Sequence, residues 1–281
     1  MLNTESRVDY YKGLIYKEIL LLLNDVTESR IKQAMEYMLL GAGKRIRPIL
    51  AIGTVEMLGG NPEKIIKFAA CLEILHTYSL IHDDLPAMDN DIERRGMPTC
   101  HIKFDEATAI LAGDALLNLV FEVISSDNNL SNKQKVSLIK IISTSSGANG
   151  MILGQIMDIQ FQEIEYNLDD MIKMHKLKTG ALFVACFTVG GVLSNANKKT
   201  FSLLQDFGEN FGSLFQIVDD IDDISNEYEA NIVNSTNYEK AIEIAKSNHS
   251  NAYKILAELN IGNDSIPQYM LDLLCKKIDL K

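Results

Sequence analysis

The chain has 281 residues, of which 47% are hydrophobic and 23% charged, and its net charge is −11. This composition is typical of a soluble globular protein, and the negative charge excludes a nucleic-acid binder that relies on a general basic field. The four cysteines are far apart, and the N-terminal stretch MLNTESRVDYYKG lacks a basic start followed by a long apolar run. We therefore expect a cytoplasmic protein with reduced cysteines, no signal peptide and no membrane span.

Apolar residues recur every three or four positions along most of the chain, which predicts helices. The clearest segments are residues 8–23, 28–40, 49–58, 65–81, 107–125 and 133–146. Glycine- or asparagine-containing turns separate them, and strand-like alternation, repeats and linkers are nearly absent. We predict one all-α domain over residues 1–281, with roughly ten or more helices packed around a central cavity.

The helix predicted over residues 65–81 leads into an acidic cluster, LIHDDLPAMDNDIERRG at residues 80–96. Its charged core comprises Asp83, Asp84, Asp89, Asp91, Arg94 and Arg95. Surface charges are usually interspersed with polar residues, whereas these acids follow a segment with the composition of a buried helix. We therefore expect them to project from the core into a cavity.

A second apolar helix, FGSLFQIVDDIDDI at residues 211–224, also ends in aspartates. Asp219 and Asp223 are four residues apart and project from one helix face, with Asp220 beside them. Like charges at this spacing destabilise a bare helix by a few tenths of a kcal/mol, so a compensating cation is expected. Carboxylate ligands suit Mg²⁺, which bridges one or two carboxylates to substrate phosphates. A solvated helix end would explain one such cluster, but two favour a metal site.

Basic residues gather at the starts of predicted helices. GAGKRIRP at residues 41–48 supplies Lys44, Arg45 and Arg47, and KLKTG at residues 176–180 supplies Lys176 and Lys178. Guanidinium groups bind phosphate oxygens with two parallel hydrogen bonds, and lysine adds a point charge. GAGK is not a nucleotide-binding P-loop, because an arginine follows the lysine and no strand precedes it. Diphosphate recognition in an apolar helical cavity is the expected chemistry.

These stretches resemble the trans-prenyl diphosphate synthase family, and within it the bacterial farnesyl diphosphate synthases. The resemblance lies in GAGKRIRP, LEILHTYSLIHDDLPAMDNDIERRGMPTCH, ILAGDALL, GQIMDI, KTGALF and FQIVDDIDD, which together span most of residues 41–225. It implies an all-α bundle around a deep central cavity, and a homodimer. The implied substrates are isopentenyl diphosphate and an allylic diphosphate, dimethylallyl or geranyl.

The resemblance also implies a role for each matching residue. The predicted Mg²⁺ ligands are Asp83, Asp84, Asp89, Asp219, Asp220 and Asp223. Residues that match contacts to the allylic diphosphate are Arg94 and Lys178; those that match contacts to isopentenyl diphosphate are Lys44, Arg47, His76 and Arg95. Dipoles that face the developing allylic cation come from Gln155, Thr179 and Gln216. Roughly three Mg²⁺ ions are implied with the bound diphosphate, and Mn²⁺ is an alternative.

The implied reaction begins when metals and cations stabilise the leaving diphosphate, so that the allylic C–O bond ionises. The isopentenyl double bond then attacks the cation, and a proton is lost. A floor in the cavity limits chain growth. Tyr78 lies five residues before Asp83, a little over one helical turn, and is predicted to be that floor. Ser79 beside it is too small to block, so farnesyl diphosphate is the expected main product.

The chain departs from the family after Asp223, where the segment that normally carries glycines and two lysines is shorter and lacks both lysines. This departure keeps open a second hypothesis, a catalytically impaired homologue or regulatory partner of an active synthase. A third hypothesis is a helical metal-dependent phosphohydrolase built around His82 and Asp83. A terpene cyclase would share the acidic helices, but it would not need Lys44, Arg47 or the other predicted contacts to isopentenyl diphosphate.

Overall fold

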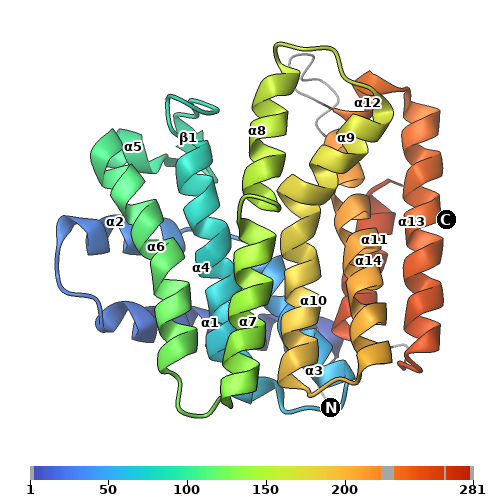
Figure 1. Cartoon of the computed structure of the whole chain (residues 1–281), viewed down its shortest axis with the longest axis horizontal. Helices are drawn as coiled ribbons and strands as arrows, with labels where there is room; N and C mark the ends of the chain where they lie inside the picture. The colour runs from blue at the N-terminus through green and yellow to red at the C-terminus, as the bar shows by residue number, and fades with distance from the viewer. Residues whose placement is uncertain (1–2, 223–230, 263, 279–281) are drawn as a thin grey trace. The chain divides into compact units, whose positions relative to one another are not determined.

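The computed structural model describes residues 3–222, 231–262 and 264–278. It forms two compact units, residues 1–52 with 62–139 and residues 53–61 with 140–281. Within the described residues nearly every element is a helix, and the two strands have two residues each. The all-α class predicted from the apolar periodicity is confirmed (Figure 1).

The first unit contains α1 (Thr4–Asn24), α2 (Arg30–Leu39), η1 (Pro62–Ile65), α4 (Ile66–Asp83), β1 (Glu93–Arg94), β2 (Met97–Pro98), α5 (Cys100–Lys103) and α6 (Glu106–Ser126). The second unit contains α8 (Met151–Phe161), α9 (Leu168–His175), η2 (Lys176–Gly180), α10 (Ala181–Leu193), α11 (Lys198–Asp222), α12 (Ile232–Ser235), α13 (Tyr238–Glu258) and α14 (Ile266–Lys277). Two helices have residues in both units, α3 (Ile46–Met57) and α7 (Asn132–Ser146).

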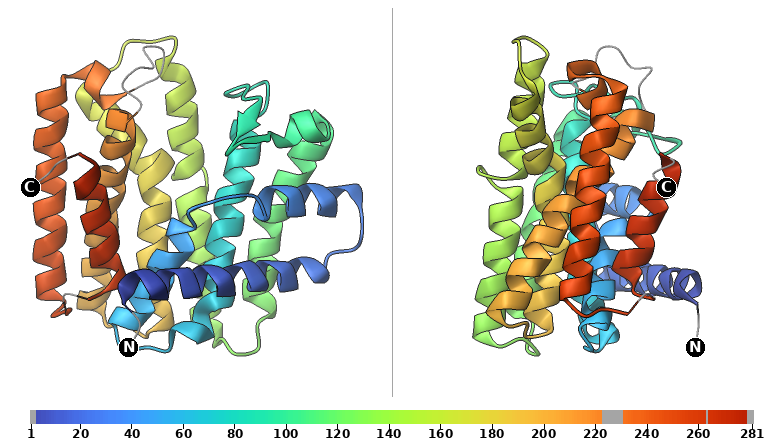
Figure 2. Two further views of the ribbon diagram at one scale, coloured as in Figure 1. Left: turned by 180° about the vertical axis from the view of Figure 1, so that it is seen from behind. Right: turned by 90° about the vertical axis from the view of Figure 1, so that its right-hand side faces the viewer.

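Helix α4 is the core of the first unit. It runs alongside α6 (Figure 1), and α1 lies across it (Figure 2). Its apolar side chains are buried around most of the circumference, including Leu72, Ile74 and Leu75. Each such side chain contributes about 1.5–3 kcal/mol to folding. An N-cap fixes the start of α6, because the Asp105 carboxylate accepts a hydrogen bond from the Thr108 backbone N–H.

A short hairpin follows α4 and carries both arginines of the first acidic cluster. Strands β1 and β2 pair antiparallel, with Arg94 opposite Met97. The two loop residues, Arg95 and Gly96, have φ values of 56° and 77°, as a two-residue hairpin turn of the primed type requires. A left-handed conformation costs an arginine about 1 kcal/mol, so this turn holds Arg95 in a specific direction at some expense in stability.

The second unit is built on α11, which packs against both α10 and α13. Aromatic rings fill the contact between α10 and α11. Phe187 and Phe207 meet edge to face with centroids 4.8 Å apart, and the Phe183 and Phe211 centroids are 5.2 Å apart. Such pairs contribute about 0.5–1.5 kcal/mol beyond their burial. Helices α9 and α10 are joined through η2, a single π-helical turn, into one continuous helical segment.

Three helical segments are long and apolar enough, by length and composition alone, to cross a membrane: Pro62–Asp83, Glu106–Ser126 and Leu168–Leu193. The fold buries 78%, 44% and 56% of their apolar windows, respectively. The first ends in Asp83 and the third contains Lys178, and ionisable groups are costly in a bilayer. The absence of a membrane span stays a prediction.

Candidate active site

The acidic end of α4 brings two of the predicted metal ligands together. Asp83 is the last residue of the helix, and its backbone C=O accepts a hydrogen bond of 2.9 Å from the Asp89 N–H. The loop between them is closed by bonds from the Met88 and Asn90 N–H groups to the Leu85 C=O. The segment between Asp83 and Asp89, which contains Pro86, therefore folds into a compact turn. It returns the exposed Asp89 to the end of α4 beside the partly exposed Asp83.

Asp84 lies differently, although it is adjacent to Asp83. Its side chain is fully buried, and its Oδ1 accepts a hydrogen bond of 2.5 Å from Arg94 Nε. Arg94 also pairs with Asp91 Oδ2 at 2.7 Å. Burial raises the pKa of Asp84, while Arg94 opposes the shift. Among the described residues Asp84 Oδ2 has no hydrogen-bond partner. Asp84 therefore anchors Arg94, which is itself held between two carboxylates.

A buried ion pair supports the basic loop at residues 41–48. Arg45 Nη1 lies 2.5 Å from Glu73 Oε1, with side chains 8% and 2% exposed. Arg45 Nη2 also donates to the C=O groups of Leu39 and Gly41, at 2.6 and 2.8 Å. Arg45 thus links the loop to α4, whereas Lys44 on the same loop is exposed to solvent.

The structure brings the other predicted isopentenyl diphosphate contacts into one basic group. A Cβ at Gly43 would lie 2.7 Å from Arg95 Nη1, so the glycine allows the guanidinium to pack on the loop. Burial, followed by the charges of Arg47 and Arg95, lowers the pKa of His76 well below its usual value. His76 is therefore neutral at pH 7 and offers a phosphate an N–H donor rather than a charge.

The predicted chain-length residues lie on the same helix. Tyr78 is 4% exposed, and its ring meets His82 edge to face at 5.8 Å. Its buried hydroxyl has no hydrogen-bond partner among the described residues. Ser79 donates its hydroxyl to the His76 C=O at 2.9 Å, a local helix contact. The His82 ring lies 3.1 Å from the Ile110 C=O, which supports a structural role for that histidine.

In the second unit, the π-helical turn η2 presents Lys178 and Thr179. Lys178 Nζ donates to Asp158 Oδ2 on α8. This close packing depends on Gly154, since a Cβ there would collide with the Lys178 backbone. Gln155 follows that glycine on α8 and is partly exposed. Thr179 Oγ1 donates to Gln216 Oε1 at 2.7 Å, so two of the three predicted cation-facing residues meet where η2 contacts α11.

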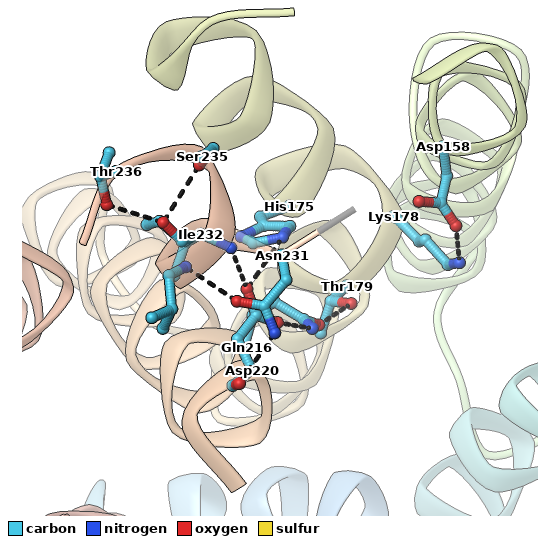
Figure 3. A network of polar contacts seen from close by, with 11 residues as sticks. Asp158, His175, Lys178, Thr179, Gln216, Asp220, Asn231, Ile232, Ser235 and Thr236 are labelled. Carbon is cyan, nitrogen blue, oxygen red and sulfur yellow. Dashed lines mark hydrogen bonds and ion pairs between the residues drawn. The ribbon is translucent and has the colours of Figure 1, made fainter. Parts of the chain in front are cut away.

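Adjacent aspartates of α11 differ in solvent exposure, as those at the end of α4 do. Asp219 is exposed, whereas Asp220 is 5% exposed and enclosed by protein donors (Figure 3). Asp222 pairs with Lys277 of α14. Asp223, the remaining predicted ligand, lies outside the described residues, as does the shortened segment that follows it.

The donor set fits magnesium. In the described part of the chain, no three His, Cys, Asp or Glu side chains are grouped closely enough to hold a metal by themselves. The accessible candidates are carboxylates, Asp83 with Asp89 and separately Asp219. Mg²⁺ typically takes one or two carboxylates and completes its octahedron with waters and phosphate oxygens. This sparse, oxygen-only set is also a poor match to a phosphohydrolase that needs several histidine ligands.

Sequence reasoning missed four supporting residues. Glu73 was detectable as one acid inside an otherwise apolar run, and Asp158 as the acid four residues after Gly154 in GQIMDI. The other two, His175 and Asn231, carried no such signal, because their partners come from other elements.

An all-α fold whose helices end in aspartates close to arginines and lysines suits an enzyme that handles metal-bound diphosphates. Comparison with known proteins narrows this class. A model of the polyprenyl synthetase family matches residues 28–263, and the chain therefore belongs to the polyprenyl synthetase family. The family predicted from the sequence is confirmed.

The relatives are similar over most of the chain. The farnesyl diphosphate synthase of Micrococcus luteus is 42% identical over 252 residues, which cover 90% of this chain and 82% of the relative. That of Haemophilus influenzae is 46% identical over 197 residues, covering 69% and 67%. The crystal structure of a geranyltransferase from Legionella pneumophila superposes with a TM-score of 0.90 at 32% identity and covers 99% of this chain and 98% of its own. The prediction of an isoprenoid-synthase-type fold is confirmed, as is that of a prenyltransferase.

Proposed function

We propose that this protein condenses isopentenyl diphosphate with dimethylallyl or geranyl diphosphate, in the presence of Mg²⁺, to give mainly farnesyl diphosphate. The observation that carries the proposal is that α4 brings an acidic group and a basic group onto one helix. Asp83 ends α4, and the turn that follows places Asp89 beside it. His76, two helical turns earlier, lies among arginines. One helix thus offers ligands for a metal-bound diphosphate and a separate anchor for a metal-free one.

The basic group of the first unit would bind isopentenyl diphosphate. Arg47 and Arg95 supply forked donors, Lys44 a point charge, and neutral His76 one N–H. Because Arg45 is committed to Glu73, it would not contact substrate; it keeps the loop in place. These anchors would hold the isopentenyl double bond in a fixed attacking position, which removes much of the entropic barrier to a bimolecular reaction.

The residues of η2 would act on the allylic partner. Lys178 would exchange Asp158 for an oxygen of the allylic diphosphate, and the oxygens of Thr179, Gln155 and Gln216 would face the cation as the C–O bond breaks. Dipoles already fixed in direction stabilise developing charge without reorganising. The apolar side chains of α10 and α11 would keep water away from the cation.

The family resemblance assigns both acidic groups to the allylic diphosphate. Asp83, Asp89, Asp219 and Asp223 would hold Mg²⁺. When bound, Mg²⁺ neutralises charge on the leaving diphosphate. We expect roughly three Mg²⁺ ions to bind with the diphosphate, and Mn²⁺ to be able to replace Mg²⁺. Asp84 would contribute indirectly, through Arg94.

The wider setting is also proposed. A homodimer, a cytoplasmic location and the absence of a membrane span are expected from the family and the sequence. No nucleic-acid partner is expected at a net charge of −11. Relatives named as synthases at 42–46% identity favour an active enzyme over an impaired homologue or regulatory partner.

The test is incubation of the purified protein with Mg²⁺, labelled isopentenyl diphosphate and each allylic diphosphate, followed by chromatography of the dephosphorylated products. We expect farnesol from either allylic substrate. Asp83→Ala and Asp219→Ala should abolish Mg²⁺-dependent turnover while leaving the helical circular dichroism intact, and Asp206→Ala, at an exposed site on α11, should not. Product formation only after an active synthase is added would indicate a regulatory partner. Release of phosphate without condensation would indicate a phosphohydrolase.

A further inference from the structure

Asp220 is the centre of a buried polar network in the second unit (Figure 3). Its Oδ1 accepts a hydrogen bond from Gln216 Nε2 at 2.8 Å, and its Oδ2 accepts one from the Ile232 N–H at 2.8 Å. His175 Nε2 lies 3.5 Å from the same Oδ2. Asp220 and His175 are each only 5% exposed. Both carboxylate oxygens therefore already face protein donors.

This network sets the direction of the Thr179 hydroxyl. A carboxylate only accepts hydrogen bonds, so Asp220 requires Gln216 to present its amide NH₂. The Gln216 carbonyl oxygen must then point the other way, where it accepts the Thr179 hydroxyl at 2.7 Å. The Thr179 hydrogen is thereby committed to Gln216, and the free lone pairs of its oxygen face away from the glutamine. In that arrangement Thr179 would offer its oxygen lone pairs to a cation.

Asn231 fixes Asp220 in turn. Its Nδ2 donates to the Asp220 backbone C=O at 2.8 Å, and it is 4% exposed. Its Oδ1 accepts the Val233 N–H at 2.8 Å and so caps the start of α12. In the capped turn the Ile232 N–H, one residue before that of Val233, donates to the Asp220 carboxylate. One side chain thus ties α12 to the end of α11 at the residue that orients Gln216.

We propose that Asn231 is a positioning residue of the active site, which acts through Asp220 and Gln216 to orient Thr179 toward the allylic cation. The inference rests on the proposed function. It assigns to α12, the first described element after the second aspartate cluster, a part in catalysis that needs no contact with substrate. It also makes Asp220 a member of this relay, distinct from the exposed Asp219.

The experiment is a double-mutant cycle. Asn231→Ser retains a good N-cap but is too short to reach the Asp220 C=O. We expect kcat to fall roughly three- to tenfold, as for one lost buried hydrogen bond, with the KM for isopentenyl diphosphate changed less than about twofold. Asn231→Asp, which accepts a hydrogen bond at the cap but cannot donate one to Asp220, should also lower kcat. The control is Asn237→Ser, because Asn237 caps α13 by accepting the Lys240 N–H and is outside the network.

The coupling between Asn231 and Thr179 distinguishes a positioning role of Asn231 from a general loss of activity. In a Thr179→Val background, which lacks the hydroxyl, Asn231→Ser should change kcat less than about twofold, since coupled residues are not additive. The same loss in both backgrounds, an unchanged kcat in the single variants, or an equal loss in Asn237→Ser would each overturn the inference. A wild type that makes no condensation product would instead overturn the proposed function and, with it, the role assigned here.

Discussion

Removing the Glu73 carboxylate should strongly destabilise the protein. In Glu73→Ala, the Arg45 guanidinium would remain buried, with a side chain 8% exposed, and would lose the carboxylate at 2.5 Å. Its bonds to the Leu39 and Gly41 C=O groups would remain but cannot neutralise a charge. Breaking one side of a buried ion pair costs about 3–5 kcal/mol. The loop that carries Lys44 would also loosen, which should raise the KM for isopentenyl diphosphate.

The corresponding shift in melting temperature can be worked out. An unfolding entropy of about 2.1 cal/mol/K per residue gives about 0.6 kcal/mol/K for 281 residues. The melting temperature should therefore fall by about 5–9 °C, measured by circular dichroism at 222 nm. The control is Asp9→Ala, which removes an ion pair to Lys12 whose side chains are 40% and 69% exposed and should cost less than about 1 kcal/mol.

A double variant sharpens the test. Arg45→Met combined with Glu73→Leu should be less destabilised than Glu73→Ala alone, because it leaves no buried charge. A Glu73→Ala variant that melts within about 2 °C of wild type, or a double variant that is the less stable of the two, would contradict this expectation.

Three further predictions concern single residues. Arg95→Ala should raise the KM for isopentenyl diphosphate by the loss of a charged hydrogen-bond pair, about 1.5–3 kcal/mol, and an unchanged constant in steady-state assays would remove that role. Tyr78→Ala should lengthen the product toward geranylgeranyl diphosphate in chromatography of the dephosphorylated alcohols; an unmoved length distribution would show that another residue is the floor. His175 should make the fold acid-sensitive. Burial lowers its pKa from 6.5 to about 4, so the unfolded state binds the proton first and stability falls as the pH drops from about 6.5 to about 4, by roughly 3 kcal/mol in all. Urea titrations across that range should show a smaller loss in His175→Gln, and an equal loss would contradict the assignment.

The helices could be predicted from the sequence because their apolar repeat is a local property. Residues 107–125 became α6, Glu106–Ser126, and residues 133–146 became α7, Asn132–Ser146. The hairpin that turns Arg95 was missed, since its strands have only two residues each and leave no alternation to detect. Strands this short are defined by their pairing, which the sequence does not display.

The two aspartate clusters show where prediction from the sequence ends. It placed both at helix ends; α4 ends at Asp83, and Asp219, Asp220 and Asp222 lie in the last described turn of α11. It treated adjacent aspartates as equivalent ligands. Consecutive helical residues point about 100° apart, so Asp84 and Asp220 turn inward to Arg94 and Gln216 while their neighbours face outward. Which of two identical residues is buried depends on the elements packed around the helix.

The π-helical turn η2 has a consequence for how this protein can be altered. A π turn accommodates one residue more than an α-helical turn of the same height, while the helix on either side keeps its own faces. Shortening KLKTG by one residue would therefore leave the apolar packing of α10 largely as it is, yet change where Lys178 and Thr179 point. Scaffold and reactive groups can thus be adjusted separately at this position, which makes it a natural place for evolution or an engineer to retune the chemistry without rebuilding the fold.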